Sequence, residues 1–384
     1  MAWARDKVEY LITVNHGLAH ISADEVYRLI GRRPHIYDNY VRLRGSIDDA
    51  YKLIIWGRTV HRVYLVLFED QFNSLDDIGR KVSELDYKEL YPRGASFRLR
   101  TIRVGEHPFN SMDANRVVGG HINKALKESG LEPKVDLDNP DVEFVLRIVD
   151  DKFVFMVNLV GEALHRRMYR RFLHPASIKT SIAASMIMLS RWGDENFIDP
   201  MAGGGTIPIE AAMYRYNYAP GLYRESHPLI KLPLFSIEDY TEVRRQALQM
   251  RLSDKLPQEI IGNDISRRYV EGAKINAASA GVDKYIEFYN YDARLLHRKG
   301  VPHGDYVVVV NPPYGIRMTR MKVVPNLYRD VLASLYTIGA YKVVSITARW
   351  REMLEAYEAN GFKLREKLEV LHGRLTTYIL VGEA

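Results

Sequence analysis

The stretch that decides the fold is VVVVNPPYGIRM, residues 307–318, in which four valines run directly into an amide, two prolines and a tyrosine. A continuous β-branched run that ends at turn residues is typical of a central parallel strand covered on both faces. Pro312 and Pro313 lack a backbone N–H and have fixed φ angles, so the strand must end rigidly at Asn311. The stretch therefore predicts a buried strand whose carboxyl end presents Tyr314 and free carbonyl oxygens to a planar ligand that offers an N–H.

Strands and helices alternate around this strand from about residue 174 onward. Strands are expected near residues 196–199, 259–263, 285–289, 305–310 and 341–347. Helices are expected near residues 176–190, 205–215, 238–253, 266–280, 325–338 and 350–360. Repeated βαβ units predict a doubly wound parallel sheet, and two closing strands over 363–381 should add one antiparallel strand to it.

Two smaller α+β units are predicted before this sheet. The first has strands near residues 7–14, 40–44 and 61–68 and helices near 22–30, capped by Ser22, and 47–57. The second has strands near residues 96–104, 142–149 and 152–159, a helix near 111–128, and a hairpin turn at Asp150-Asp151. Short alternating segments of this kind are typical of α+β domains.

Composition bounds the class of protein. At 384 residues, with 47% hydrophobic and 27% charged residues, the chain predicts two or three globular domains. The absence of cysteine excludes disulfides, thiolate metal sites and a cysteine nucleophile, and the histidines have no ligand-like spacing, so we expect no metal. Residues 1–6 do not begin a signal peptide, and no later run is long enough for a membrane span, so a cytoplasmic location is expected.

Positive charge is concentrated in one short segment. The net charge of +6, from 54 basic and 48 acidic residues, is a mild indication of a polyanionic partner. Residues 165–172, HRRMYRRF, place Arg166, Arg167, Arg170 and Arg171 beside aromatic side chains. Such a segment can be a solvated surface, but its position between two predicted domains favours contact with nucleic acid.

A glycine loop, residues 203–205, follows the first strand of the C-terminal sheet in the stretch FIDPMAGGGT. Glycines between a strand and a helix allow a ligand to approach the backbone in the crevice of an open sheet. A dinucleotide fingerprint would need a third glycine where Pro208 stands and an acid about 20 residues further on. The next acid at a strand end is Asp264, so the sequence disfavours a nicotinamide cofactor.

Carboxylates follow three successive strands, at Asp199, Asp264 and Asp292. Each alone could be a capping or turn aspartate. Together they line one edge of the crevice, where they can bind ribose hydroxyls, an adenine amino group or an ammonium group but would repel phosphates. A nucleoside that carries an ammonium group and no phosphate describes S-adenosylmethionine.

The Asn-Pro-Pro-Tyr corner suits a reaction at an aromatic amine. The lone pair of such an amine is delocalised into its ring. If the Asn311 side-chain oxygen and the Pro312 carbonyl accept its two hydrogens, the lone pair can turn towards an electrophile, while Tyr314 stacks on the base. A base in a helix would have to flip out to reach this corner.

Residues 174–384 resemble the Rossmann-fold methyltransferases whose amino-methylating members carry Asn-Pro-Pro-Tyr. The glycine loop, the strand-end acids and the final antiparallel strand match, and residues 174–180, HPASIKT, resemble the preceding helix that covers the methionine part of the cofactor. The resemblance implies catalysis by Asn311, Pro312, Pro313 and Tyr314. It implies S-adenosylmethionine contacts at Ile178, Lys179, Asp199, Pro200, Ala202, Gly203, Gly204, Gly205, Thr206, Asp264, Ile265, Asp292, Ala293 and Asn311.

The N-terminal half resembles a THUMP domain, an RNA-binding module that occurs with a ferredoxin-like partner. The resemblance rests on FRLR at 97–100, the helix at 111–128, Val135-Asp136-Leu137 before Pro140, and GEALHR at 161–166. It implies RNA contacts at Arg98, Arg100, Arg166, Arg167, Arg170 and Arg171. The expected domains are ferredoxin-like (1–90), THUMP (91–163), a linker with the leading helix (164–190) and a methyltransferase domain (191–384).

This pairing of domains is similar to the tRNA and rRNA guanine-N2 methyltransferases. Within that group, the length and the single catalytic domain look most like the archaeal and bacterial enzymes that methylate guanosine 6 of tRNA. The alternatives left open are an rRNA guanine-N2 or tRNA guanosine-10 methyltransferase, an adenine-N6 methyltransferase, and a non-catalytic RNA-binding protein. We expect a monomer.

Overall fold

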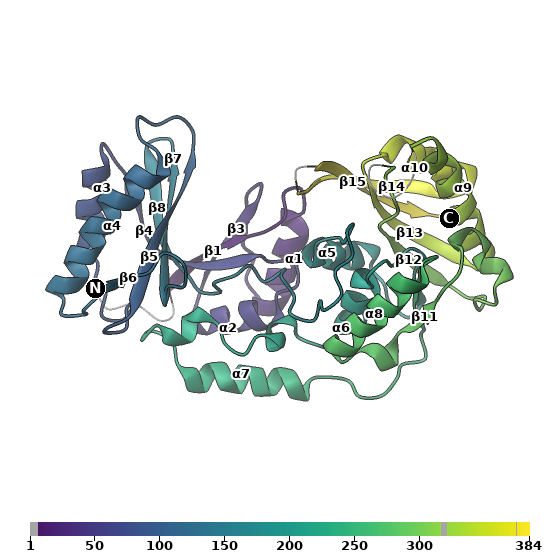
Figure 1. Ribbon diagram of the computed structural model, residues 1–384, viewed down its shortest axis with the longest axis horizontal. Helices are drawn as coiled ribbons and strands as arrows, with labels where there is room; N and C mark the ends of the chain where they lie inside the picture. Colours follow the sequence, from purple (N-terminus) through teal and green to yellow (C-terminus); the bar gives the residue numbers. More distant parts are fainter. Residues whose placement is uncertain (1–6, 316–320, 374) are drawn as a thin grey trace.

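Two β-sheets organise the chain in the computed structural model, which describes residues 7–315, 321–373 and 375–384 (Figure 1). Residues 1–6, considered above for a signal peptide, and Ile316 to Met318 of the opening stretch lie outside the described residues. Within the described ranges, no helix has the length and apolar character needed to cross a membrane.

The first sheet has eight strands in the order β2-β3-β1-β4-β8-β7-β5-β6. Its strands are β1 (Val8–Thr13), β2 (His35–Ile36), β3 (Tyr40–Gly45), β4 (Arg62–Gln71), β5 (Ser96–Val104), β6 (Lys134–Val135), β7 (Val142–Val149) and β8 (Lys152–Asn158). The helices packed with it are α1 (Ala19–Ile30), α2 (Ile47–Trp56), α3 (Leu75–Ser83) and α4 (Ser111–Glu128). The ten-residue β4 pairs with β1 on one edge and with β8 on the other, so the two predicted N-terminal units share one continuous sheet.

Helix α1 begins three residues earlier than predicted, at Ala19. The preceding Gly17 adopts a positive φ of 81°, and the Leu18 N–H donates to the Asn15 carbonyl, which forms the turn that starts the helix. Ser22 therefore lies fully buried in the second turn, and its prediction as the N-cap is wrong.

The second sheet has seven strands in the order β11-β10-β9-β12-β13-β15-β14. These are β9 (Asn196–Asp199), β10 (Ile260–Asn263), β11 (Glu287–Tyr289), β12 (Tyr306–Val310), β13 (Ala340–Thr347), β14 (Lys363–His372) and β15 (Leu375–Glu383). β15 runs antiparallel to both of its neighbours, and the other pairs are parallel, as the sequence predicted. Every residue of β12 is buried, which confirms it as a central strand.

Helices cover both faces of this second sheet. They are α5 (Thr180–Ser190), α6 (Thr206–Arg215), α8 (Arg267–Ala280), α9 (Val324–Thr337) and α10 (Trp350–Ala359). The core on one face includes Ile182 of α5 and Ile209 of α6, and the core on the other includes Leu332 of α9 and Met353 of α10. α5 begins at Thr180 rather than at the predicted residue 176, because residues 174–179 form a turn that lies against the glycine loop.

The segment between α6 and β10 leaves the second sheet and its helices and packs on the N-terminal half. It contains η1 (Pro220–Tyr223), η2 (Pro228–Lys231) and α7 (Ile237–Gln249), and Figure 1 shows α7 lying beneath α2. Leu229 and Phe235 belong to the same buried core as Tyr51 of α2. The Ser236 N–H also donates to the Tyr51 hydroxyl at 2.8 Å. This crossing segment fastens the two halves together.

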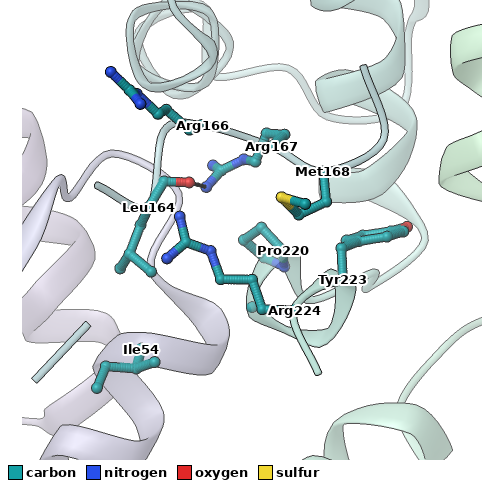
Figure 2. Close-up of a pocket in the computed structure, with 9 residues that line it drawn as sticks. Ile54, Leu164, Arg166, Arg167, Met168, Pro220, Tyr223 and Arg224 are labelled. Carbon is teal, nitrogen blue, oxygen red and sulfur yellow. Dashed lines mark hydrogen bonds between the residues drawn. The ribbon is translucent and has the colours of Figure 1, made fainter. Parts of the chain in front are cut away.

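An arginine holds the linker between the halves at the same junction (Figure 2). The Arg224 guanidinium donates to the carbonyls of Val160, Glu162 and Ala163 at 3.1, 2.7 and 2.7 Å. Because carbonyls in a non-helical linker need donors when water is excluded, these bonds fix the path of the chain between the two sheets.

Gly17 is expected to be required for contact between the N-terminal half and β14. A Cβ at this position would lie 1.8 Å from the Glu369 carbonyl oxygen. Gly17→Ala should therefore lower the free energy of unfolding by roughly 3 kcal/mol, since strain from the left-handed backbone adds to a forced displacement of packed backbone. Denaturant unfolding measures the loss.

Gly31→Ala is the matched control. Gly31 has a similar φ of 78° but nothing within 4 Å of a Cβ. The free energy of unfolding of Gly31→Ala should fall by only about 1–2 kcal/mol, the strain of an alanine in the left-handed conformation. Equal losses in the two variants would show that the contact with β14 contributes nothing.

Candidate active site

One cavity of about 980 Å³ lies at the carboxyl ends of β9, β10, β11 and β12. The strand order reverses between β9 and β12, which is where open α/β sheets bind ligands. All of the predicted catalytic and cofactor positions except Gly205 line it, namely Ile178, Lys179, Asp199, Pro200, Ala202, Gly203, Gly204, Thr206, Asp264, Ile265, Asp292, Ala293, Asn311, Pro312, Pro313 and Tyr314. Chain segments more than 130 residues apart in sequence thus meet at one site.

The glycine loop is tied to the end of β10. The Gly203 N–H donates to the Asp264 carboxylate at 2.9 Å, and the Ser266 N–H donates to the other oxygen of that carboxylate at 2.9 Å. Gly205 has a different reason to be glycine, because a Cβ there would lie 2.9 Å from the Cβ of Ala273. The close packing of α6 on α8 therefore requires Gly205, and its contact with the cofactor stays a prediction.

Asp199 is a buried acid beneath the loop. Its side chain accepts a hydrogen bond from the Met201 N–H at 3.1 Å, and the residue is 1% exposed. Burial raises the pKa of this carboxyl well above its ordinary value, and repulsion from the Asp264 carboxylate adds to the effect. Asp199 therefore holds the start of the loop through the Met201 N–H, and its environment favours the neutral form of its carboxyl group.

Asp292 at the end of β11 stays ionised. The Arg294 guanidinium donates to its two oxygens at 2.5 and 3.0 Å, and this hydrogen bonding lowers the pKa of the carboxyl. Arg294 also lines the cavity. A ligand that binds Asp292 must therefore share this carboxylate with Arg294.

The Asn-Pro-Pro-Tyr corner closes the other side of the cavity. The Asn311 Nδ2 donates to the Ala176 carbonyl at 3.4 Å, and the Tyr314 hydroxyl donates to Asn311 Oδ1 at 2.5 Å. An amide oxygen has two lone pairs, so Asn311 Oδ1 keeps one for a ligand. The Tyr328 hydroxyl donates to the Pro313 carbonyl at 3.0 Å, whereas none of the described donors bonds the Pro312 carbonyl. Two acceptor positions are thus available at this corner.

Several lining residues were not predicted from the sequence. They include Tyr269 of α8, Leu327 of α9, and His372 and Leu375 of the last hairpin. The first turn of α8 follows Asp264 directly, so Tyr269 had a weak local signal. The hairpin and α9 lie far along the chain from the glycine loop, and no local pattern indicates that they reach this cavity.

Arg167, predicted to bind RNA, is a structural residue. Its guanidinium forms a buried ion pair with Glu210 at 3.2 Å and donates to the carbonyls of Leu164 and Arg58 at 2.6 and 2.8 Å. Figure 2 shows it turned towards Leu164. The side chain is 2% exposed, so the prediction of RNA contact is wrong.

Arg170 also points into the protein. Its guanidinium donates to the Ile178 carbonyl at 2.5 Å and to the Thr206 hydroxyl at 2.9 Å, so it joins the segment before α5 to the start of α6. Arg166 and Arg171 are exposed, and their contact with RNA stays a prediction. The same holds for Arg98 and Arg100, which share Glu143 as an ion-pair partner.

The described residues contain no cluster of three or more His, Asp or Glu side chains that is arranged to hold an ion.

Comparison with known proteins decides the family. Residues 167–378, more than half of the chain, match the family model described as RMKL-like, methyltransferase domain. The chain belongs to this methyltransferase family. Residues 72–158 match the THUMP domain model, which confirms the predicted combination of domains, while the predicted boundaries stay predictions.

Three relatives extend this result over the whole chain. The tRNA (guanine(6)-N2)-methyltransferase of Methanocaldococcus jannaschii is 34% identical over 382 residues, which cover 97% of this chain and 99% of that protein. The crystal structure of a possible methylase from Clostridium difficile 630 has a TM-score of 0.86 and 27% identity over 98% of both chains. The structure of SMU.472 complexed with SAH has a TM-score of 0.83 and 25% identity, again over 98% of both chains.

Asp199 predicts how stability depends on pH. Because the pKa of its carboxyl is raised on folding, the folded chain binds more protons than the unfolded chain between the two pKa values, and stability falls as pH rises through that interval. Asp199→Asn removes the ionisable group and keeps an oxygen for the Met201 N–H. Its free energy of unfolding should match wild type below about pH 4 and exceed it by at least about 1 kcal/mol at pH 7.

Denaturant unfolding across this pH range measures the difference. Asp254→Asn, at an exposed aspartate, is the control and should follow wild type at every pH. An Asp199→Asn variant that is less stable than wild type at pH 7 would contradict the assignment of a destabilising buried charge.

Proposed function

We propose that the chain transfers a methyl group from S-adenosylmethionine to the exocyclic N2 of a guanosine in tRNA, at position 6. The observation that carries the proposal is the cavity that joins the glycine loop and the strand-end carboxylates to the Asn-Pro-Pro-Tyr corner. The name and full-length similarity of the Methanocaldococcus jannaschii relative support tRNA and position 6 as the target.

The residues around the glycine loop fit this cofactor. Asp264 and Asp292 offer carboxylate oxygens for ribose hydroxyls and the adenine amino group, as expected for a nucleoside without phosphates. Ile265, which follows Asp264 and also lines the cavity, is 69% exposed, and an adenine ring would cover this apolar side chain. When bound, the cofactor supplies an electrophilic methyl carbon on a sulfonium.

The corner at Asn311 activates the amine of the target base. The free lone pair of Asn311 Oδ1 and the Pro312 carbonyl accept the two N2 hydrogens, so the nitrogen lone pair turns out of conjugation with the ring. With S-adenosylmethionine bound, this lone pair would be directed at its methyl carbon; methylation would release S-adenosylhomocysteine and one N2 proton to solvent. The chain contributes orientation and fixed acceptors rather than a strong base.

The N-terminal sheet offers a surface that suits the RNA. Successive side chains on a strand point to opposite faces, and residues such as Tyr10, Leu43 and Phe144 pack under the helices. By this alternation, the opposite face carries the arginines Arg42, Arg44, Arg62, Arg98, Arg100 and Arg147. On that face, Tyr40 stacks on Tyr37 at 4.4 Å and lies 5.0 Å from the Arg147 guanidinium. Arginines beside exposed rings are typical of RNA-binding surfaces.

Incubation with total tRNA and isotopically labelled S-adenosylmethionine tests the proposal. Label should appear in N2-methylguanosine, and mapping of the digested tRNA should place it at position 6. Label in N6-methyladenosine, or in rRNA but not tRNA, would replace the proposal with one of its rivals.

Asn311→Ala is expected to separate binding from chemistry. The variant keeps the glycine loop and Asp264, so calorimetry should give nearly wild-type affinity for S-adenosylhomocysteine. It loses one of the two amine acceptors, and turnover should fall by roughly 100-fold or more, the cost of removing one preorganised hydrogen-bonding group at a reacting centre. Lost cofactor affinity with unchanged turnover would reverse the role given to Asn311.

A further inference from the structure

A short segment before α5, residues 171–177, crosses over the glycine loop, and we call it the strap. One buried asparagine of α8, Asn276, joins the strap to the loop. Asn276 Oδ1 accepts the N–H groups of Arg171 and Phe172, both at 2.8 Å. Its Nδ2 donates to the carbonyls of Phe172 and Gly204, at 3.0 and 2.9 Å. All four hydrogen bonds that an amide side chain can make are thus formed in a residue that is 2% exposed.

The rings of the strap occupy space that three glycines leave open. A Cβ at Gly272 would lie 2.3 Å from the Phe172 ring. Cβ atoms at Gly203 and Gly204 would lie 3.3 and 3.2 Å from His174. The strap and the glycine loop are therefore fitted to one another, and a shift of the strap would alter the wall of the cavity that His174 and Gly203 line.

The strap also reaches the catalytic corner. Its Ala176 carbonyl accepts the Asn311 Nδ2 at 3.4 Å, while the Ala176 N–H is held by His174 Nδ1 at 3.2 Å. With Nδ2 directed to the strap, Asn311 Oδ1 faces the Tyr314 hydroxyl and the cavity. A 180° flip of the Asn311 amide would place its NH₂ group where the amine of a base needs an acceptor. Two hydrogen-bond donors would then face each other, and the base could not bind in this orientation.

We propose that Asn276 is a positioning residue for methyl transfer. It holds the strap on the glycine loop and, through the Ala176 carbonyl, sets which end of the Asn311 amide faces the substrate. This role rests on the function proposed above. Asn276 does not line the cavity, so it acts through the strap and not by touching the ligand.

The position of Asn276 within α8 supports this role. Asparagine is a weaker helix former than the alanines Ala273 and Ala277 that flank it on the buried face of this helix. The four hydrogen bonds of its side chain go to the strap and the loop. Asn276 therefore lowers the stability of α8 slightly, while its side chain stabilises two segments outside that helix.

The test replaces Asn276 and measures binding and turnover separately, under conditions where circular dichroism shows that the variants are folded. Asn276→Ala loses four hydrogen bonds, and the Kd for S-adenosylhomocysteine from calorimetry should rise about tenfold or more. At saturating S-adenosylmethionine, kcat for tRNA should still fall by roughly 100-fold, because the Asn311 amide is no longer held in one orientation. Asn276→Asp keeps the shape of the side chain and the two hydrogen bonds that it accepts, but it loses the two that it donates. This variant should also raise Kd and lower kcat.

Asn360→Ala is the control. The Asn360 amide bonds backbone carbonyls of Arg329 and Ala356 at 3.2 and 2.8 Å, away from the cavity, so Kd and kcat should match wild type. Wild-type Kd and kcat in both Asn276 variants would overturn the positioning role and leave the proposed function standing, even if the variants unfold at a lower temperature. Failure of the wild-type chain to bind S-adenosylhomocysteine would overturn both.

Discussion

The rigid end of β12 is the constraint on which the rest of the structure depends. Tyr306–Val310 are all buried and are hydrogen-bonded on both edges, to β9 and to β13, so the strand cannot shift without breaking two parallel ladders. The two prolines that follow remove backbone freedom, and the Tyr328 hydroxyl fixes the second proline carbonyl. Asn311 is thereby held at a set place beside the glycine loop, which leaves the adjacent strand β9. A reaction that relies on orientation rather than on a strong base needs such a fixed relation.

Packing and hydrogen bonds also hold the two halves of the chain together. The segment between α6 and β10 contributes Leu229 and Phe235 to the N-terminal core, and Arg224 binds the linker carbonyls. The buried Arg167–Glu210 pair adds little net stability as a pair, but loss of either partner would strand a charge in the interior. The arginine-bearing face of the first sheet and the catalytic cavity are therefore kept in a defined relation, which suits an enzyme that must grip an RNA at one place and act on it at another.

Local patterns were sufficient to predict most elements. β-branched runs, glycines and strand-end acids identified the second sheet and its antiparallel strand, and together with the family resemblance they identified 16 of the 30 residues that line the cavity. The rest depended on packing between distant segments. β4 joins two predicted units because its second edge happens to meet β8. Gly205 packs against Ala273, Arg167 pairs with Glu210, and Asn276 holds the strap by hydrogen bonds. The partners in each of these contacts lie far apart in sequence, so no local pattern indicates them. An arginine cluster looks the same in sequence whether its members face solvent, as Arg166 and Arg171 do, or donate to backbone carbonyls of other residues, as Arg167 and Arg170 do.

The most direct test of the central claim uses a tRNA transcript in which inosine replaces guanosine 6. Inosine keeps the purine ring and its carbonyl but lacks the exocyclic N2 amine that Asn311 and Pro312 are expected to hold. The account predicts no transfer of label from S-adenosylmethionine to position 6 of this transcript, while the matching guanosine transcript is methylated. Equal labelling of the two transcripts would contradict the claim that the corner at the end of β12 acts on that amine.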